Sequence, residues 1–209
     1  MAYKNILDLL HRLGFNCETF SETIVVLGDE REYYISPLGV KLCGDKLVAR
    51  IFKNTKLHKM VASHCRECSI CVTSDPLLFY KAVLDRSSLR VIASRRVAVP
   101  SIDGCDAYVE GRVGEKKDKG LYTEISISPL DVSYEEKPPS TYNRAGPAII
   151  EALVYITKIP YFEKSEQERF YIKILWCREI VYHSSTSELL RRIIDDIVAR
   201  ANNIIGREK

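Results

Sequence analysis

The sequence predicts an α+β protein in which an antiparallel β-barrel is followed by a helical region of about three helices. Short β-branched and apolar segments separated by tight turns succeed one another up to about residue 133, and short connections favour antiparallel pairing over βαβ units. From Pro147 onward, apolar residues recur at spacings of three and four, which is the period of a helix. We therefore expect a barrel domain at residues 1–133 and a linker with a helical domain at residues 134–209.

Composition narrows the class of protein. The chain is 46% hydrophobic and 28% charged, with a net charge of +3. This globular mixture argues against a disordered chain and is too mildly basic for a dedicated nucleic-acid binder. No run approaches the roughly 20 apolar residues of a membrane-spanning helix, and Met1–Leu13 lacks the apolar region of a signal peptide. Seven cysteines, an odd number, do not support a secreted disulfide framework. We expect a cytoplasmic protein that binds neither membrane nor nucleic acid.

The amino-terminal part is predicted to begin with one helix and three strands. Met1–Leu13 carries Ile6, Leu7 and Leu10 at helical spacing. Apolar and β-branched residues then predict strands at Glu22–Leu27, Glu32–Leu42 and Lys46–Phe52, with a tight turn at residues 43–45. Proline at position 37 interrupts the second of these strands and indicates an edge or a bulge, because it removes a ladder donor.

Short helices and strands alternate in the next part. Asn54 or Thr55 suits the N-cap of a helix that ends near Ser63, and Asp75 with Pro76 suits the beginning of another. Strands are predicted at Cys68–Thr73, Leu89–Ser94, Asp106–Val113 and Tyr122–Ile127. The charged stretch at residues 114–120 is expected to be a solvated hairpin tip.

The composition changes at Tyr134. The polar, proline-rich residues 134–147 are typical of a connector. Three helices are predicted after it, at Ala148–Lys158, at Glu163–Tyr182 and beyond a cap at residues 185–187, and the last of them has a broad apolar stripe.

The segment Arg50–Met60 carries the clearest chemical signal. A strand there delivers the chain to the beginning of a helix, where free N–H groups and the helix dipole favour an anion. Arg50 and Lys53 lie at the strand end, and Lys56 lies in the first helical turn. A lysine in the first turn opposes the dipole unless an anion is bound. A phosphate site and a capped surface helix with solvated lysines both agree with this pattern.

The order of several segments resembles a family of mainly archaeal flavoproteins, which is classed among domains of unknown function and is related to the flavin-reductase split barrels. The segments are ETIVVL, SPLGVKL, ARIFKNTKLHKM, VTSDPLLFYKA, YVEGRV and NRAGPAIIEALVYITKI, within about residues 20 to 160. The resemblance implies a split barrel that binds FMN non-covalently, usually across a homodimer interface. It leaves open whether the protein is also an oxidoreductase, since split barrels include reductases, oxidases and carriers.

The resemblance also implies which residues bind the cofactor. The residues that would bind the FMN phosphate are Arg50, Lys53, Asn54, Thr55 and Lys56. The residues that would pass beside the isoalloxazine ring are Ser36, Pro37 and Gly39, the last because a small residue lets backbone approach closely. Asn143 and Arg144 would complete the site.

A cysteine cluster supports a different class of function. Cys65, Cys68 and Cys71 keep a C-x2-C-x2-C spacing similar to an iron–sulfur motif, which would make a metal-binding or redox-sensing module. If residues 69–73 form a strand, however, Cys68 and Cys71 point to opposite faces and cannot share one metal, so we expect no metal.

Nucleic-acid binding and histidine-based catalysis have less support in the sequence. A basic RNA- or nucleotide-binding barrel is a third alternative, but 28 acidic residues dilute its charge. The four histidines have no motif partners, so any chemistry would be carried by the flavin.

Overall fold

The computed structural model describes residues 5–63, 65–136, 141 and 143–206. In chain order its elements are α1 (Ile6–Arg12), β1 (Ser21–Gly28), β2 (Tyr33–Cys43), β3 (Lys46–Phe52), α2 (Lys56–Ser63), β4 (Glu67–Val72), α3 (Pro76–Leu84), the 3-10 turn η1 (Arg86–Ser88), β5 (Val91–Ile92), β6 (Ser101–Ile102), β7 (Ala107–Asp118), β8 (Tyr122–Tyr134), α4 (Ala145–Lys158), the 3-10 turn η2 (Ile159–Tyr161), α5 (Lys164–Ser184) and α6 (Glu188–Ile204). The predicted helical start at residues 1–4 and the predicted connector residues 137–140 and 142 lie outside the described residues.

The described residues form two compact units. The first lies within Met1–Thr73 and Ser88–Lys137 and contains the strands, and the second lies within Ser74–Ser87 and Pro138–Lys209 and is helical. Helix α3 therefore groups with the helical unit, although its sequence interrupts the barrel. The domain boundary expected between residues 133 and 134 stays a prediction.

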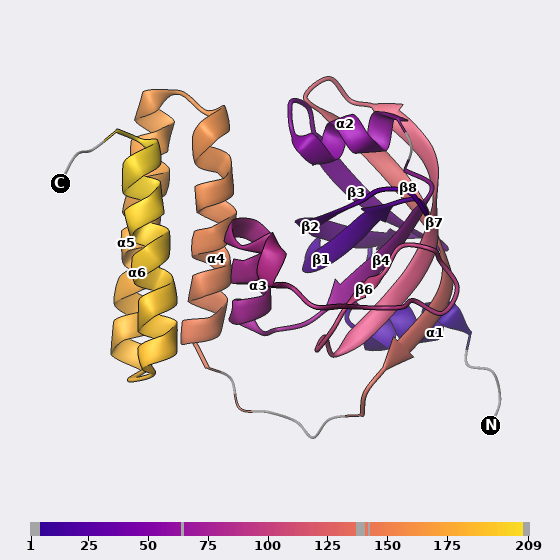
Figure 1. The fold of residues 1–209 in the computed structure, drawn as a ribbon, viewed down its shortest axis with the longest axis horizontal. Coiled ribbons are helices and arrows are strands. Elements are labelled where there is room, and N and C mark those ends of the chain that lie inside the picture. The colour runs from indigo at the N-terminus through magenta and orange to yellow at the C-terminus, as the bar shows by residue number, and fades with distance from the viewer. Residues whose placement is uncertain (1–4, 64, 137–140, 142, 207–209) are drawn as a thin grey trace. The chain divides into compact units, whose positions relative to one another are not determined.

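Six strands of the first unit close into an antiparallel barrel in the order β1-β2-β3-β8-β7-β4 (Figure 1). Successive side chains of a strand point to opposite faces, and β3 shows this alternation clearly. Leu47, Ala49 and Ile51 are buried in the core, whereas Arg50 and Phe52 are exposed. The antiparallel barrel predicted from the sequence is confirmed.

Two helices of the same unit contribute to the barrel core. Leu10 of α1 and both Leu57 and Val61 of α2 are buried in it, and Figure 1 shows α2 across the upper end of the barrel. Burying one such side chain stabilises the fold by about 1.5–3 kcal/mol. The beginning of α2 is thereby fixed against the barrel end, next to the end of β3.

Strand β2 differs from the sequence prediction because it is continuous. Pro37 pairs with Ile24 of β1 within an unbroken register, so the expected interruption is wrong. The β2–β3 ladder covers only Val40–Cys43, so Pro37 has a paired neighbour on one side alone. The missing N–H therefore costs no ladder bond on the other side.

The predicted hairpin tip at residues 114–120 is also corrected. Strand β7 runs to Asp118 and β8 begins at Tyr122, so the turn is only three residues long. A register shift lies between Val113 and Lys116. Beyond it, the Lys116 ammonium donates to the carbonyl of Val61 in α2. The charged stretch is exposed, as predicted, but most of it is strand rather than the tip of the hairpin.

The segment between α3 and β7 is held on the barrel by two carboxylates. Glu110 is only 3% exposed, and its two oxygens accept the backbone N–H groups of Arg95 at 2.8 Å and Arg96 at 2.5 Å. Glu67 accepts the N–H of Ala98 at 2.6 Å. The predicted strand at Leu89–Ser94 shrinks to β5, which pairs with β6 in a separate two-stranded sheet.

The second unit contains α3, α4, α5 and α6, which pack against one another. Asp75 caps α3 by accepting the N–H of Leu77 at 2.8 Å, as the sequence predicts. Ile149 of α4, Ile174 of α5 and Ile197 of α6 are fully buried. Among the described residues, no helix combines the length and the apolar character needed to cross a bilayer.

Candidate functional site

The turn between β3 and α2, which we call the α2 corner (residues 53–56), is built by a left-handed residue and a hydroxyl cap. Asn54 has φ = 69°, a conformation that asparagine tolerates better than most residues. The Thr55 hydroxyl accepts the N–H of His58 at 3.0 Å and donates to the Phe52 carbonyl at 2.8 Å. Thr55 is therefore the N-cap that the sequence predicts, and the first N–H groups of α2 have no intrahelical partner.

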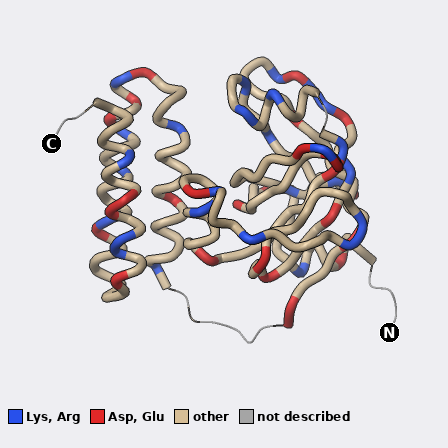
Figure 2. The backbone as a smooth tube through the Cα atoms, in the orientation of Figure 1, with Lys and Arg blue, Asp and Glu red and all other residues tan. Residues whose placement is uncertain are grey.

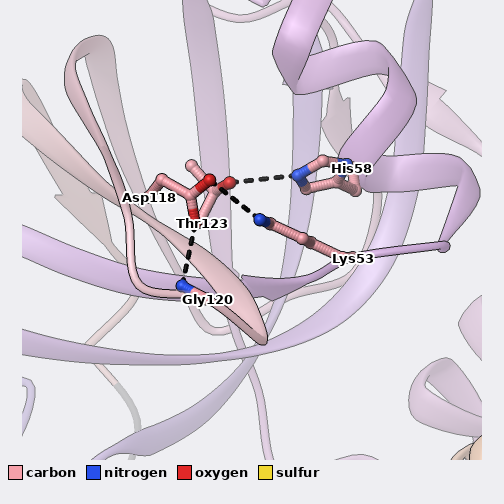
Figure 3. Close-up of polar contacts among 5 residues, drawn as sticks. All are labelled: Lys53, His58, Asp118, Gly120 and Thr123. Carbon is pink, nitrogen blue, oxygen red and sulfur yellow. Dashed lines mark hydrogen bonds and ion pairs between the residues drawn. The ribbon is translucent and has the colours of Figure 1, made fainter.

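Lys53 of this corner is engaged with a carboxylate in the structure. Its ammonium lies 2.8 Å from Oδ2 of Asp118, and Oδ1 of Asp118 accepts the N–H of Gly120 at 2.8 Å (Figure 3). The Lys53 hydrogen bond, followed by the Gly120 N–H, lowers the pKa of Asp118 below its usual value. Beside this pair, Nε2 of His58 lies 3.0 Å from the Thr123 hydroxyl. No local sequence pattern indicates these partners, because β7 and β8 lie far along the chain from β3.

Arg50 lies in a different environment, on the outer face of the barrel. Its guanidinium stands 4.7 Å from the centre of the Phe20 ring and 5.2 Å from that of Tyr122. The Lys41 ammonium also lies over the Phe20 ring, 5.2 Å from its centre, and Phe52 meets Tyr122 edge-on. We call these five residues the outer-face cluster.

Arg50 and Lys53 thus lie on opposite sides of the β3–β8 pair. Arg50 pairs with Glu124, whereas the next residue, Ile51, is buried in the core and pairs with Thr123. Asp118 is also a partner of Thr123, so the Lys53–Asp118 pair is on the side that faces α2. The structure therefore does not bring the five predicted phosphate ligands together as one cluster, because a spacing of three on a strand changes the face.

The residues predicted to lie beside the flavin ring are also divided between the two faces of β2. Ser36 pairs with Val25, a core residue, so it faces inward. Pro37 and Gly39 alternate with it and face outward. The Phe20 side chain lies over Gly39, 3.5 Å from where a Cβ would stand. Phe20 of the outer-face cluster therefore lies against both Gly39 and Arg50.

Asn143 and Arg144 precede α4 in the helical unit. The side-chain oxygen of Asn143 accepts the N–H of Ala145 at 2.8 Å, so this residue helps to begin the helix. Figure 2 shows Lys and Arg interspersed with Asp and Glu along the barrel unit. One of these carboxylates, that of Asp118, lies 2.8 Å from the ammonium of the predicted ligand Lys53.

The cysteine triplet does not form a metal site. Cys65 and Cys68 are buried in the barrel core. The Cys71 sulfur instead accepts the N–H of Ile102, a residue of β6 outside the barrel, at 3.4 Å. Cys68 and Cys71 thus face opposite ways, as predicted for a strand. Burial raises the pKa of Cys65 to about 11 and that of Cys68 further, which favours the protonated form of both thiols. Among the described residues, no group of three or more His, Cys, Asp or Glu could hold an ion.

The fold and the corner define an α+β protein with a six-stranded antiparallel barrel and a helical unit. Residues 21–136, more than half of the chain, match the family model described as protein of unknown function (DUF447), N-terminal domain. The chain belongs to this family. No protein with a curated description matches it.

Several solved structures resemble this chain. An FMN-bound protein of the same DUF447 family from Methanosarcina mazei superposes with a TM-score of 0.74 at 19% identity, over 92% of this chain and 99% of that one. An NADH:FAD oxidoreductase from Streptomyces globisporus (TM-score 0.47, 12% identity, 68% and 95% covered) and an FMN-binding protein from Thermus thermophilus (0.49, 16%, 58% and 75%) are more distant. The last two likenesses are too weak to bear on the fold.

Proposed function

We propose that this chain is an FMN-binding flavoprotein. The observation that carries the proposal is the likeness, along nearly the whole of both chains, to an FMN-bound member of its own family. A bound flavin would supply electron or hydride transfer, and the protein would supply its position and electrostatic surroundings. The part of the chain that the structure describes offers no set of side chains that would name a substrate, so the proposal stops at cofactor binding.

The α2 corner suits the phosphate end of FMN. A phosphate dianion is bound by cations, hydroxyls and free helix N–H groups. Lys53, Asn54, Thr55 and Lys56 are grouped there, at the amino-terminal end of α2, where the first N–H groups have no intrahelical partner. We propose that these four residues bind the phosphate.

The outer-face cluster suits the ring end of FMN. Aromatic rings and a guanidinium stack on flat conjugated systems, and Gly39 lets a ligand approach the backbone. We propose that one FMN reaches around the end of β3, with its phosphate at the α2 corner and its ring toward Pro37, Gly39 and Arg50. Ser36 faces the barrel interior and would lie behind these residues in the strand. Asn143 and Arg144 remain proposed ligands, and a cytoplasmic location remains a prediction.

The phosphate assignment is tested by comparing FMN with riboflavin, which has the same ring but no phosphate. Lys53→Ala removes one charge-assisted bond, worth about 1.5–3 kcal/mol. FMN should therefore bind about ten- to hundredfold more weakly, and riboflavin about as well as before. Titration of the flavin-free protein by fluorescence quenching gives both affinities.

The matched control is Lys46→Ala, an exposed lysine at the other end of β3, which should change neither affinity. Wild-type protein that carries no flavin after purification and binds none on titration would overturn the proposed function. Equal weakening of both ligands by Lys53→Ala would move the phosphate away from this corner.

We further propose that the protein is a homodimer. The support is a stripe of apolar side chains on the outside of α5, where Ile172, Trp176 and Ile180 are 47%, 65% and 38% exposed. These residues recur every four positions, which places them along one line of the helix. A second copy of the chain would cover this stripe, and a tryptophan at its middle is typical of an interface centre.

A further inference from the structure

Asp118 is held in place more firmly than an ordinary surface carboxylate. Its two oxygens have different partners, the ammonium of Lys53 and the N–H of Gly120, each at 2.8 Å (Figure 3). Gly120 has φ = 78°, and the N–H of Lys119 donates to the carbonyl of Tyr122 at 2.9 Å, which closes the turn. The carboxylate is therefore set by the hairpin, and Lys53 reaches across to it.

This position matters because Lys53 is a cation of the α2 corner. Asp118 places a negative charge against the same ammonium that would bind a phosphate. The pair is partly exposed, with 36% of the Lys53 side chain and 68% of the Asp118 side chain accessible. An ion pair of this kind contributes little to the stability of the folded state, so the fold does not depend on it.

We propose that Asp118 is a built-in competitor for the flavin phosphate, which sets how strongly the site prefers FMN over riboflavin. This inference rests on the proposed function. A phosphate dianion at the corner must share or take over Lys53, and it then lies close to the Asp118 charge. Like charges at such distances disfavour one another, so Asp118 lowers the affinity for any phosphorylated flavin and leaves an unphosphorylated one unaffected.

The competition has a further consequence for the corner without ligand. Lys53 and Lys56 both stand beside the positive end of the α2 dipole, which is unfavourable for cations. Asp118 neutralises Lys53, whose ammonium lies 2.8 Å from its carboxylate. The same carboxylate therefore offsets part of the unfavourable charge of the empty corner and weakens the filled one, which favours exchange of the cofactor over permanent retention.

The test is Asp118→Asn, which keeps the shape and the acceptor oxygen for Gly120 but removes the charge. FMN should bind about two- to fivefold more tightly, because an exposed pair is worth up to about that factor, and riboflavin affinity should not change. Asp118→Glu retains the charge and should bind FMN like the wild type. The matched control is Glu115→Gln on the same hairpin, since Glu115 pairs with Lys117 and not with Lys53.

The outcomes separate this inference from the proposed function. Unchanged or weaker FMN binding by Asp118→Asn, with wild-type protein binding FMN normally, would overturn the competitor role alone. Weaker binding would make Asp118 a residue that positions Lys53 for the phosphate. A gain in affinity for riboflavin as large as that for FMN would also overturn it. Wild-type protein that binds no FMN would overturn the proposed function, and the competitor role with it.

Discussion

At the scale of single residues, the two cations Arg50 and Lys53 divide the candidate site between two surfaces. Arg50 is exposed on β3 and stacked between Phe20 and Tyr122, whereas Lys53 follows the strand and is paired with Asp118. A guanidinium over an aromatic face is stabilised by about 0.5–1 kcal/mol at an exposed site. Arg50 therefore has a structural role in the outer-face cluster in addition to any contact with the cofactor.

Because of this geometry, substitutions of Arg50 and of Lys53 should change the FMN and riboflavin affinities in different ways. Because Arg50 faces away from the α2 corner, Arg50→Ala should weaken FMN and riboflavin binding by the same factor, unlike Lys53→Ala. Arg50→Lys, which keeps the charge but lacks the planar group, should behave like Arg50→Ala. The measurement is the ratio of FMN to riboflavin affinity in each variant. A selective loss of FMN affinity in Arg50→Ala would place the phosphate on the outer face.

Some of these residue roles could be predicted from the sequence, and others could not. The Thr55 cap depends on neighbours within three positions, which a sequence displays directly. The Lys53–Asp118 pair joins residues 65 positions apart, and its formation depends on the register of β3, β7 and β8, including the shift after Val113. The separation of Arg50 from Lys53 is the exception, because strand alternation alone predicts that residues three apart on a strand face opposite sides.

At the scale of elements, a carboxylate joins the last two helices. Asp195 of α6 accepts hydrogen bonds from Nε of Arg178 and from the hydroxyl of Tyr182, both in α5 and both at 2.6 Å. Partial burial opposes ionisation of Asp195, but the bonds from Tyr182 and Arg178 outweigh it, so its pKa lies below the usual value. The ionised form of Asp195 thus stabilises the α5–α6 contact.

The sign of the pH dependence follows from this lowered pKa. A carboxylate with a lower pKa in the folded state stabilises the fold above its unfolded pKa, near 3.9, and this stabilisation is lost as pH falls through the folded value. Since Arg178 and Asp195 are each more than 40% exposed, the effect is about 0.5–1 kcal/mol. Asp195→Asn should lower the melting temperature by about 1–3 °C at pH 7.

Thermal unfolding followed by circular dichroism at several pH values tests this expectation. The difference between wild type and Asp195→Asn should shrink as the pH is lowered below 4, while Glu179→Gln, an exposed change on α5, should show no difference at any pH. A difference that stays constant down to pH 2 would show that the ionised carboxylate does not stabilise the helix pair.

Elements with strong local patterns could be predicted, and those held by distant groups could not. Strand β3 has the bounds that its alternation indicates, Lys46–Phe52. The segment around Arg95 and Arg96 has no such pattern, because its N–H groups are bound by Glu110 of β7. A buried glutamate in a strand is read from sequence as an exposed one, since Glu is rarely buried without partners.

At the scale of the whole molecule, the two units differ in the apolar surface that they leave exposed. The barrel buries its core within its own strands and the helices α1 and α2. In the helical unit, α5 buries Phe170, Ile174, Cys177 and Val181 on one side and still exposes an apolar stripe on another. Isolated apolar side chains on a surface are ordinary, but a contiguous line of them indicates an interaction site.

The stripe makes the proposed homodimer testable through Trp176, the single tryptophan of the chain. A stable interface buries about 800 Å² on each partner, and a tryptophan near its centre contributes much of the binding energy. Wild-type protein at micromolar concentration should therefore sediment as a dimer, and its tryptophan emission should shift to longer wavelength on dilution.

Trp176→Lys should sediment as a monomer, because the substitution places a charge in the interface, where it would lose its water. The control is Tyr161→Lys, since Tyr161 is similarly exposed, at 56%, but precedes α5; this variant should stay dimeric. A wild-type monomer would exclude the homodimer, and a dimer that survives Trp176→Lys would place the interface on a surface other than α5.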